Sequence, residues 1–336
     1  MSVLRLPYRS PAWLRWPVLR GHVQTIVPAV LARKPQVTLR RERWEATPGG
    51  VPDGDFVDVD FVDADDPTAP IVVLFHGLEG SAQSHYARSL MYWTHERGWA
   101  GAVPHFRGCS GEANRTRRAY HSGDSAEIDW ILRRIAAEHP QRPLYATGVS
   151  LGGNALAKWL GEQGEAASFV QRAAVISAPL DLNAGGAALK HGFSMVYTRM
   201  FLRTLKHKTA AKFALHPDIG TGPDYLETLK RVRDLEGFDD LYTAPVHGFA
   251  NAQDYWTRSS AKPWLKHITV PTLVLNARND PFQPASALPQ AHEVSAAVRL
   301  EQPEDGGHVG FAVGPFPGQL HWRSEEHTSE LHSHSF

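Results

Sequence analysis

The chain lacks several features that mark particular classes of protein. It has a single cysteine, Cys109, in 336 residues, which excludes an internal disulfide framework and fits a reducing compartment. No run of about 18 apolar residues occurs, so no segment is expected to span a membrane. Lysine plus arginine (35) balances aspartate plus glutamate (35), so no basic surface argues for nucleic acid. These absences favour a cytoplasmic protein that does not bind nucleic acid.

Short apolar runs rich in β-forming residues recur along the chain. Helical patterns separate several of them, as at 81–98 and 125–140. Strands that alternate with helices indicate a mostly parallel sheet covered by helices on both faces. The runs lie at 55–63, 71–75, 99–104, 143–147, 173–179, 271–277 and 297–303.

Composition also divides the chain. Residues 183–266 contain no convincing central strand, so we predict a helical cap inserted into an α/β core formed by 41–182 and 267–322. The basic, aromatic segment 1–40 is expected to pack on the core, and weak contact with a membrane surface is the alternative. The polar tail 323–336 resembles the translation of a sequencing adapter, and its histidines match no zinc-site spacing. We interpret this tail as non-native.

One motif suggests nucleophilic chemistry. Residues 148–152 read Gly-Val-Ser-Leu-Gly, after the strand-like 143–147 and before a helical pattern. One interpretation is a tight turn that needs small residues and happens to include a serine. The other is a G-x-S-x-G nucleophile elbow, in which Ser150 is held at the end of a strand with its hydroxyl facing substrate. Because both flanking elements are present, we favour the elbow.

A serine nucleophile needs a base and a group that orients the base, here expected in the chain order serine, acid, histidine. Asp280 follows the strand-like run 271–277, although an Asp-Pro pair is also an ordinary turn. His308 lies in a glycine-flanked loop after the last strand, where surface histidines are also common. The required order favours Asp280 and His308 as the partners of Ser150.

Negative charge that develops during acyl transfer needs hydrogen-bond donors. The glycine-rich turn after 71–75 can supply the backbone N–H of Leu78, and Leu151 can supply a second. His76 and Glu79 in the same turn are expected to stabilise the loop rather than react.

With these residues placed, the sequence resembles the YheT-like branch of the α/β-hydrolases, from about residue 12 to 313. The resemblance implies an α/β-hydrolase fold with a mostly parallel eight-stranded sheet and a helical cap. It implies a cofactor-free and metal-free serine esterase, lipase-like, acting on acyl or lipid esters, and it matches Ser150, Asp280 and His308 to the family's triad. The matching stretches include GHVQTI (21–26), HGLEGS (76–81), FRGCSGEAN (106–114), GVSLGGN (148–154), FDDLYTAPVHGF (238–249), VPTLVLNARNDPF (270–282) and GGHVGF (306–311).

Several alternatives stay open from the sequence. An acyltransferase could use the same three residues, and a lipid-binding relative could retain the fold without catalysis. Cys109 is expected to be a buried structural residue because no partner pattern supports a thiol mechanism. Arg107, His121 and Asp124 either line the pocket or form an internal polar network, and we favour the network.

Overall fold

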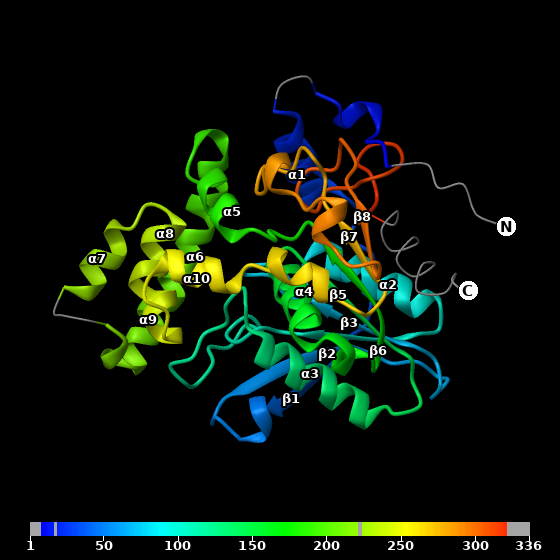
Figure 1. Ribbon diagram of the computed structural model, residues 1–336, viewed down its shortest axis with the longest axis horizontal. Helices are drawn as coiled ribbons and strands as arrows, with labels where there is room; N and C mark the ends of the chain where they lie inside the picture. The colour runs from blue at the N-terminus through cyan, green and yellow to red at the C-terminus, as the bar shows by residue number, and fades with distance from the viewer. Residues whose placement is uncertain (1–7, 17–18, 221–223, 321–336) are drawn as a thin grey trace.

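A mixed sheet of eight strands forms the centre of the computed structural model, which describes residues 8–16, 19–220 and 224–320 (Figure 1). The strand order is β1-β2-β4-β3-β5-β6-β7-β8; β2 pairs antiparallel with β1 and β4, and all other pairs are parallel. The predicted mostly parallel sheet is therefore confirmed. The tail 323–336, which the sequence suggested to be non-native, lies outside the described residues. The strands are β1 Arg40–Glu45, β2 Phe56–Val62, β3 Ile71–Phe75, β4 Ala100–Pro104, β5 Leu144–Val149, β6 Val170–Ile176, β7 Thr272–Leu275 and β8 Val298–Glu301.

The apolar runs in the sequence did not include β1, whose sequence is RRERWE. This strand forms through its partner: Arg41 lies opposite Asp60 and Arg43 lies opposite Asp58. Each guanidinium contacts the facing carboxylate, at 2.6 Å for Asp60 and 2.8 Å for Asp58. Cross-strand ion pairs of this kind stabilise a strand that has no apolar alternation.

Helices cover both faces of the sheet. Because side chains alternate along a strand, Val72 of β3 packs in one core cluster with α2, and Val73 packs in the other with α3 and α4. The helix α1 lies against the loops that follow β7 and β8 (Figure 1). These helices span α1 Arg20–Leu31, α2 His85–Glu96, α3 Ser125–Glu138 and α4 Leu151–Gln163.

The described chain between β6 and β7, at 177–220 and 224–271, contains helices joined by loops and no strand. In Figure 1 most of these helices group on one side of the sheet. They are α5 Leu182–Ala188, α6 Met195–Leu215, α7 Tyr225–Arg231, α8 Leu235–Phe238, a π-helix Asp239–Thr243, α9 Ala244–His247 and α10 Ala252–Ser259.

Short 3₁₀ helices complete the secondary structure. None of the described helices has both the length and the apolar composition that crossing a membrane requires. The 3₁₀ helices are Ala12–Leu14, Pro48–Gly50, Gly164–Ala167, Gly192–Ser194, Pro217–Ile219, Lys262–His267, Ala285–Ala287 and Ala291–Glu293.

Candidate active site

Ser150 occupies a strained turn between β5 and α4. Its backbone has φ 53° and ψ −121°, a region that side chains other than glycine rarely adopt. The flanking glycines have a steric cause. A Cβ on Gly148 would lie 2.5 Å from the carbonyl oxygen of Gly152, and a Cβ on Gly152 would lie 2.4 Å from that of Phe75. The G-x-S-x-G spacing is thus what this turn requires to fit against β3 and its own helix.

The structure brings the three predicted side chains into contact. His308 Nε2 lies 2.9 Å from Ser150 Oγ, and His308 Nδ1 lies 2.9 Å from Asp280 Oδ2. Ser150 follows β5, Asp280 follows β7 and His308 follows β8, and the parallel strands end at the same edge of the sheet. Because an ionised carboxylate only accepts hydrogen bonds, Nδ1 carries the proton, which leaves Nε2 free to accept the proton of the serine hydroxyl.

Neighbouring groups fix the orientation of this pair. The N–H of Phe282 donates to Asp280 Oδ1 at 2.8 Å, which leaves Oδ2 facing the histidine. The Phe282 ring stacks on the His308 imidazole, with centroids 3.9 Å apart and planes 13° from parallel. The Asp280 side chain is fully buried and that of His308 is 9% exposed. Phe282 therefore holds one face of the imidazole, and Asp280 holds its Nδ1.

The loop after β3 leaves one backbone donor free. The N–H of Gly77 donates to the hydroxyl oxygen of Tyr86 at 2.8 Å, and the N–H of Glu79 donates to that of Tyr120 at 3.0 Å. The N–H of Leu78, between them, finds no acceptor in the described part of the chain. Of the described turn residues 77–81, only Leu78 thus keeps an unpaired backbone N–H, and it is the residue that the sequence suggested.

The second predicted donor lies beside the serine. Leu151 is the first residue of α4, where backbone N–H groups have no partner within the helix, and its N–H has no other acceptor among the described residues. Leu78, Leu151 and Ser150 line the same cavity, and a Cβ on Gly77 would come within 3.1 Å of the Ser150 Cβ. Two free N–H groups beside a hydroxyl can stabilise an oxyanion that forms there.

His76 supports this loop and does not face the reacting groups. Its Nε2 accepts from the N–H of Phe106 at 3.0 Å, so its Nδ1 carries the proton and donates to the carbonyl oxygen of Gly77 at 2.8 Å. Complete burial lowers the pKa of His76 to about 3, which keeps the ring neutral. Its two bonds connect the turn after β3 to the turn after β4.

A cavity of about 510 Å³ opens at Ser150, between the core and the helices that follow β6. Most of its lining is apolar. Aliphatic and aromatic side chains of several helices contribute, including Leu182 of α5, Phe201 of α6, Phe238 of α8 and Trp256 of α10. Such a space suits an apolar chain that extends away from the serine.

Sequence reasoning missed an ion pair in this cavity. Lys208 of α6 contacts Glu79 Oε2 at 2.8 Å, while the hydroxyl of Tyr120 donates to Glu79 Oε1 at 2.8 Å. The pair connects the helical segment after β6 to the loop that carries Leu78. No local pattern could have found it, because the two charged residues lie far apart in the sequence.

The cysteine lies near the same ion pair. Cys109 is buried, and burial raises the pKa of its thiol to about 12. A thiol with so high a pKa is protonated at neutral pH and is a weak nucleophile. Within the part of the chain that the structure describes, no group of three or more histidine, cysteine, aspartate or glutamate side chains is arranged to hold a metal ion.

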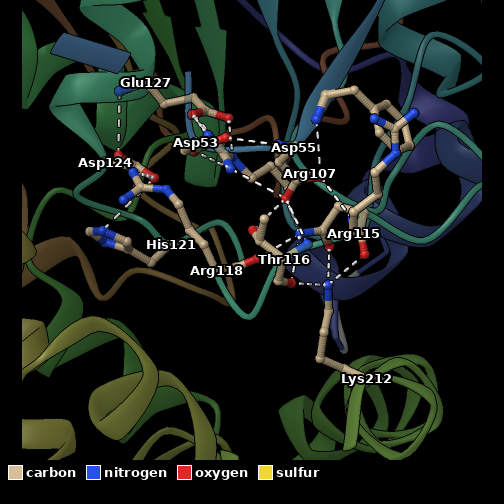
Figure 2. A network of polar contacts seen from close by, with 12 residues as sticks. Asp53, Asp55, Arg107, Arg115, Thr116, Arg118, His121, Asp124, Glu127 and Lys212 are labelled. Atoms are coloured by element: carbon tan, nitrogen blue, oxygen red, sulfur yellow. Dashed lines mark hydrogen bonds and ion pairs between the residues drawn. The ribbon is translucent and has the colours of Figure 1, made fainter. Parts of the chain in front are cut away.

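A network of buried charges supports the cavity wall (Figure 2). Arg107, whose side chain is fully buried, contacts Glu127 at 2.8 Å, Asp53 at 2.7 Å and Asp55 at 3.3 Å. Asp55 also accepts from the side chain of Asn114 at 2.6 Å. The network joins the segment before β2 to α3 and to the loop after β4, so it holds the start of that loop in place.

The two sequence interpretations of this region both hold in part. Asp124 pairs with Arg118 at 2.6 Å and caps α3, as the network interpretation expects. Arg107 and His121 belong to the polar cluster in Figure 2 and also line the cavity. Burial lowers the pKa of His121 to about 3, so its ring is neutral.

Removal of the central cation should destabilise the fold. Arg107→Met would leave the carboxylates of Asp55 and Glu127 buried without their partner, a change that typically costs about 3–5 kcal/mol. The free energy of unfolding, measured by urea denaturation, checks this. Arg133→Met is the control because Arg133 pairs with Asp129 on an exposed face of α3, where less than about 1 kcal/mol is expected. Equal losses for the two variants would contradict a stabilising role for the buried network.

Comparison with known proteins identifies the family to which this fold belongs. The family model of the alpha/beta hydrolase fold matches residues 70–315. The chain is 43% identical over 295 residues to YheT of Escherichia coli (strain K12), a protein named as an esterase. The match covers 87% of this chain and 84% of that protein. It is 27% identical to the human phospholipase ABHD3, covering 89% of this chain and 73% of that protein. Among solved structures, the Pyrococcus furiosus esterase Pf2001 superposes with a TM-score of 0.53 at 14% identity, covering 90% of this chain and 96% of that one.

Proposed function

We propose that this chain, which belongs to the YheT-like α/β-hydrolases, cleaves carboxylic esters through a covalent intermediate on Ser150. The observation that carries the proposal is the position of the His308 ring, which contacts Ser150 Oγ through one nitrogen and Asp280 through the other. The names of its relatives, an esterase and a phospholipase, support an ester hydrolase.

The reaction follows from these contacts. His308 Nε2 takes the hydroxyl proton as Ser150 Oγ attacks the ester carbonyl carbon, and Asp280 stabilises the imidazolium that forms. The N–H groups of Leu78 and Leu151 donate to the oxyanion. Collapse of this intermediate breaks the bond to the alcohol oxygen, which receives its proton from His308. Water, activated by the same imidazole, then releases the acid from Ser150.

The cavity supports acyl or lipid esters as the substrate class. Its apolar lining would hold the acyl chain while the ester carbonyl lies at Ser150. Residues 183–266 would then act as a cap over the acyl chain, since several of their helices line the cavity. The cap boundaries and the cytoplasmic location stay predictions.

An acyl-chain series tests this proposal. We expect kcat/KM for p-nitrophenyl esters to rise from acetate upward until the cavity is filled, because each buried methylene contributes about 0.8 kcal/mol, or about fourfold. Leu205→Trp, which fills part of the cavity beside α6, should move the optimum to shorter chains. Release of the acids is followed by chromatography.

The outcomes separate the alternatives. A kcat/KM that does not change with chain length, in wild type and variant alike, would contradict an acyl chain in the cavity. The same assay with added ethanol distinguishes hydrolysis from acyl transfer, since a transferase would yield mainly the ethyl ester. A folded protein that consumes no ester at all would overturn the proposed function.

A further inference from the structure

We infer that helix α1 positions the two loops that carry Asp280 and His308, with Gln24 and Thr25 as the positioning residues. The inference rests on the proposed function, because it concerns the geometry of the same three side chains. Neither residue contacts Ser150 or lines the cavity, so each would act through the groups that it holds.

Gln24 joins the two loops through one oxygen atom. The side chain is 1% exposed, and its Oε1 accepts from the N–H of Gly306 at 2.9 Å and from Nδ2 of Asn279 at 2.8 Å. Asn279 directly precedes Asp280, and Gly306 lies two residues before His308. The amide therefore fixes the spacing between the loop after β7 and the loop after β8.

The other atoms of this cluster complete the connection. Asn279 Oδ1 accepts from the N–H of Gly307 at 2.9 Å, so the two loops also contact each other. Gln24 Nε2 donates to Asp305 Oδ1 at 3.3 Å, and Asp305 pairs with Arg20 of the same helix at 2.5 Å. A buried amide is costly unless it is bonded, and here both of its ends are engaged.

Thr25 holds the backbone of His308 itself. Its Oγ1 accepts from the N–H of His308 at 2.8 Å and donates to the carbonyl oxygen of Gly21 at 2.7 Å, one helical turn earlier. The hydroxyl thus connects the α1 backbone to the residue whose ring contacts Ser150. Valine at this position would have nearly the same shape but could not accept the N–H.

Backbone contacts show that α1 packs closely against the loop after β7 and the loop after β8. A Cβ on Gly21 would lie 2.0 Å from the carbonyl oxygen of Asn279, and a Cβ on Gly310 would lie 1.7 Å from that of Gln24. The helix therefore lies directly against the backbone of both loops. This arrangement gives a physical reason for Gly21 in the GHVQTI stretch and Gly310 in the GGHVGF stretch.

A helix that only covered apolar surface would not need these contacts. Val23 and Val27 already pack α1 against Leu14, Ala312 and Leu320. Asp280 and His308 lie in loops without regular secondary structure, so their positions depend on neighbouring elements. Since a displacement of about 1 Å can cost about 100-fold in rate, a rigid support for these loops has a direct effect on catalysis.

Substitutions at both residues test the inference. Thr25→Val and Gln24→Met should lower kcat and the rate of fluorophosphonate labelling by about 10- to 100-fold, with a smaller change in KM. Thr25→Ser, which retains the hydroxyl, should recover most of the rate. Thr272→Val is the matched control: it removes a buried threonine hydroxyl that donates to the Val270 carbonyl at 2.8 Å, at the opposite end of β7.

Two further readouts separate positioning from stability. The melting temperature of each variant is measured, and rates are compared well below the lowest one. The low-field proton resonance of His308 Nδ1–H should shift or disappear in Thr25→Val and stay in Thr272→Val. If wild type is labelled on Ser150 but Thr25→Val and Gln24→Met react as fast as Thr272→Val, the positioning inference is overturned and the proposed function is not. Failure of folded wild type to label on Ser150 would instead overturn the proposed function.

Discussion

Replacing Ser150 by alanine is expected to abolish both ester hydrolysis and labelling by a fluorophosphonate. The hydroxyl is the only protein group in the proposed mechanism that bonds to the acyl carbon, so no acyl-enzyme can form without it. Loss of the nucleophile from such a triad lowers kcat by about 10⁶-fold. Intact mass after probe treatment gives the measurement: one adduct on wild type and none on Ser150→Ala.

A second serine in the same cavity provides the control. Ser122 is buried and lines the cavity, but its hydroxyl has no place in the proposed chemistry. Ser122→Ala should therefore still acquire the adduct. An adduct that persists on Ser150→Ala would place the nucleophile elsewhere, and peptide mapping would then identify the residue that carries it.

Asp280→Asn should lower kcat by about 10⁴-fold while the protein stays folded. The structure gives the reason for so large an effect from one atom. Asparagine Oδ1 can still accept from the N–H of Phe282, which turns its Nδ2 toward His308. An amide donor at that position requires Nδ1 of the imidazole to accept, so the proton moves to Nε2. Nε2 can then no longer take the proton of Ser150.

Steady-state kinetics with the best ester, together with the melting temperature, checks this prediction. Asp181→Asn is the matched control, because the Asp181 carboxylate also accepts a backbone N–H, from Ala184 at 3.1 Å. No bond of Asp181 to a histidine occurs among the described residues. We expect it to retain wild-type kcat. An Asp280→Asn variant with wild-type kcat would show that the carboxylate does not orient the imidazole.

Much of the fold follows from local patterns in the sequence. The apolar runs predict β2 to β8, because fully buried strands such as β3 have consecutive apolar side chains and strands such as β2 and β8 alternate apolar with polar ones. β1 escaped prediction since its arginines are stabilised by Asp58 and Asp60 on the neighbouring strand, and periodicity does not record such pairing.

The residues of the candidate site also differ in how far local sequence predicts them. The sequence by itself determined the turn that holds Ser150, because the glycines around this residue are a local steric requirement of that turn. It also indicated Asp280 and His308, because each follows a strand and parallel strands bring their ends to one edge. Their catalytic roles stay proposals until the variants are measured.

Only the tertiary structure decided which other groups meet these residues. The glycine-rich turn suggested the N–H of Leu78 as a donor, but only the structure shows that Tyr86 and Tyr120 occupy the N–H groups on either side of it. Likewise, Gln24 meets Gly306 across 282 positions of the chain. Local sequence encodes the conformation of a turn or a strand, whereas hydrogen bonds between distant residues exist only once packing has brought the elements together.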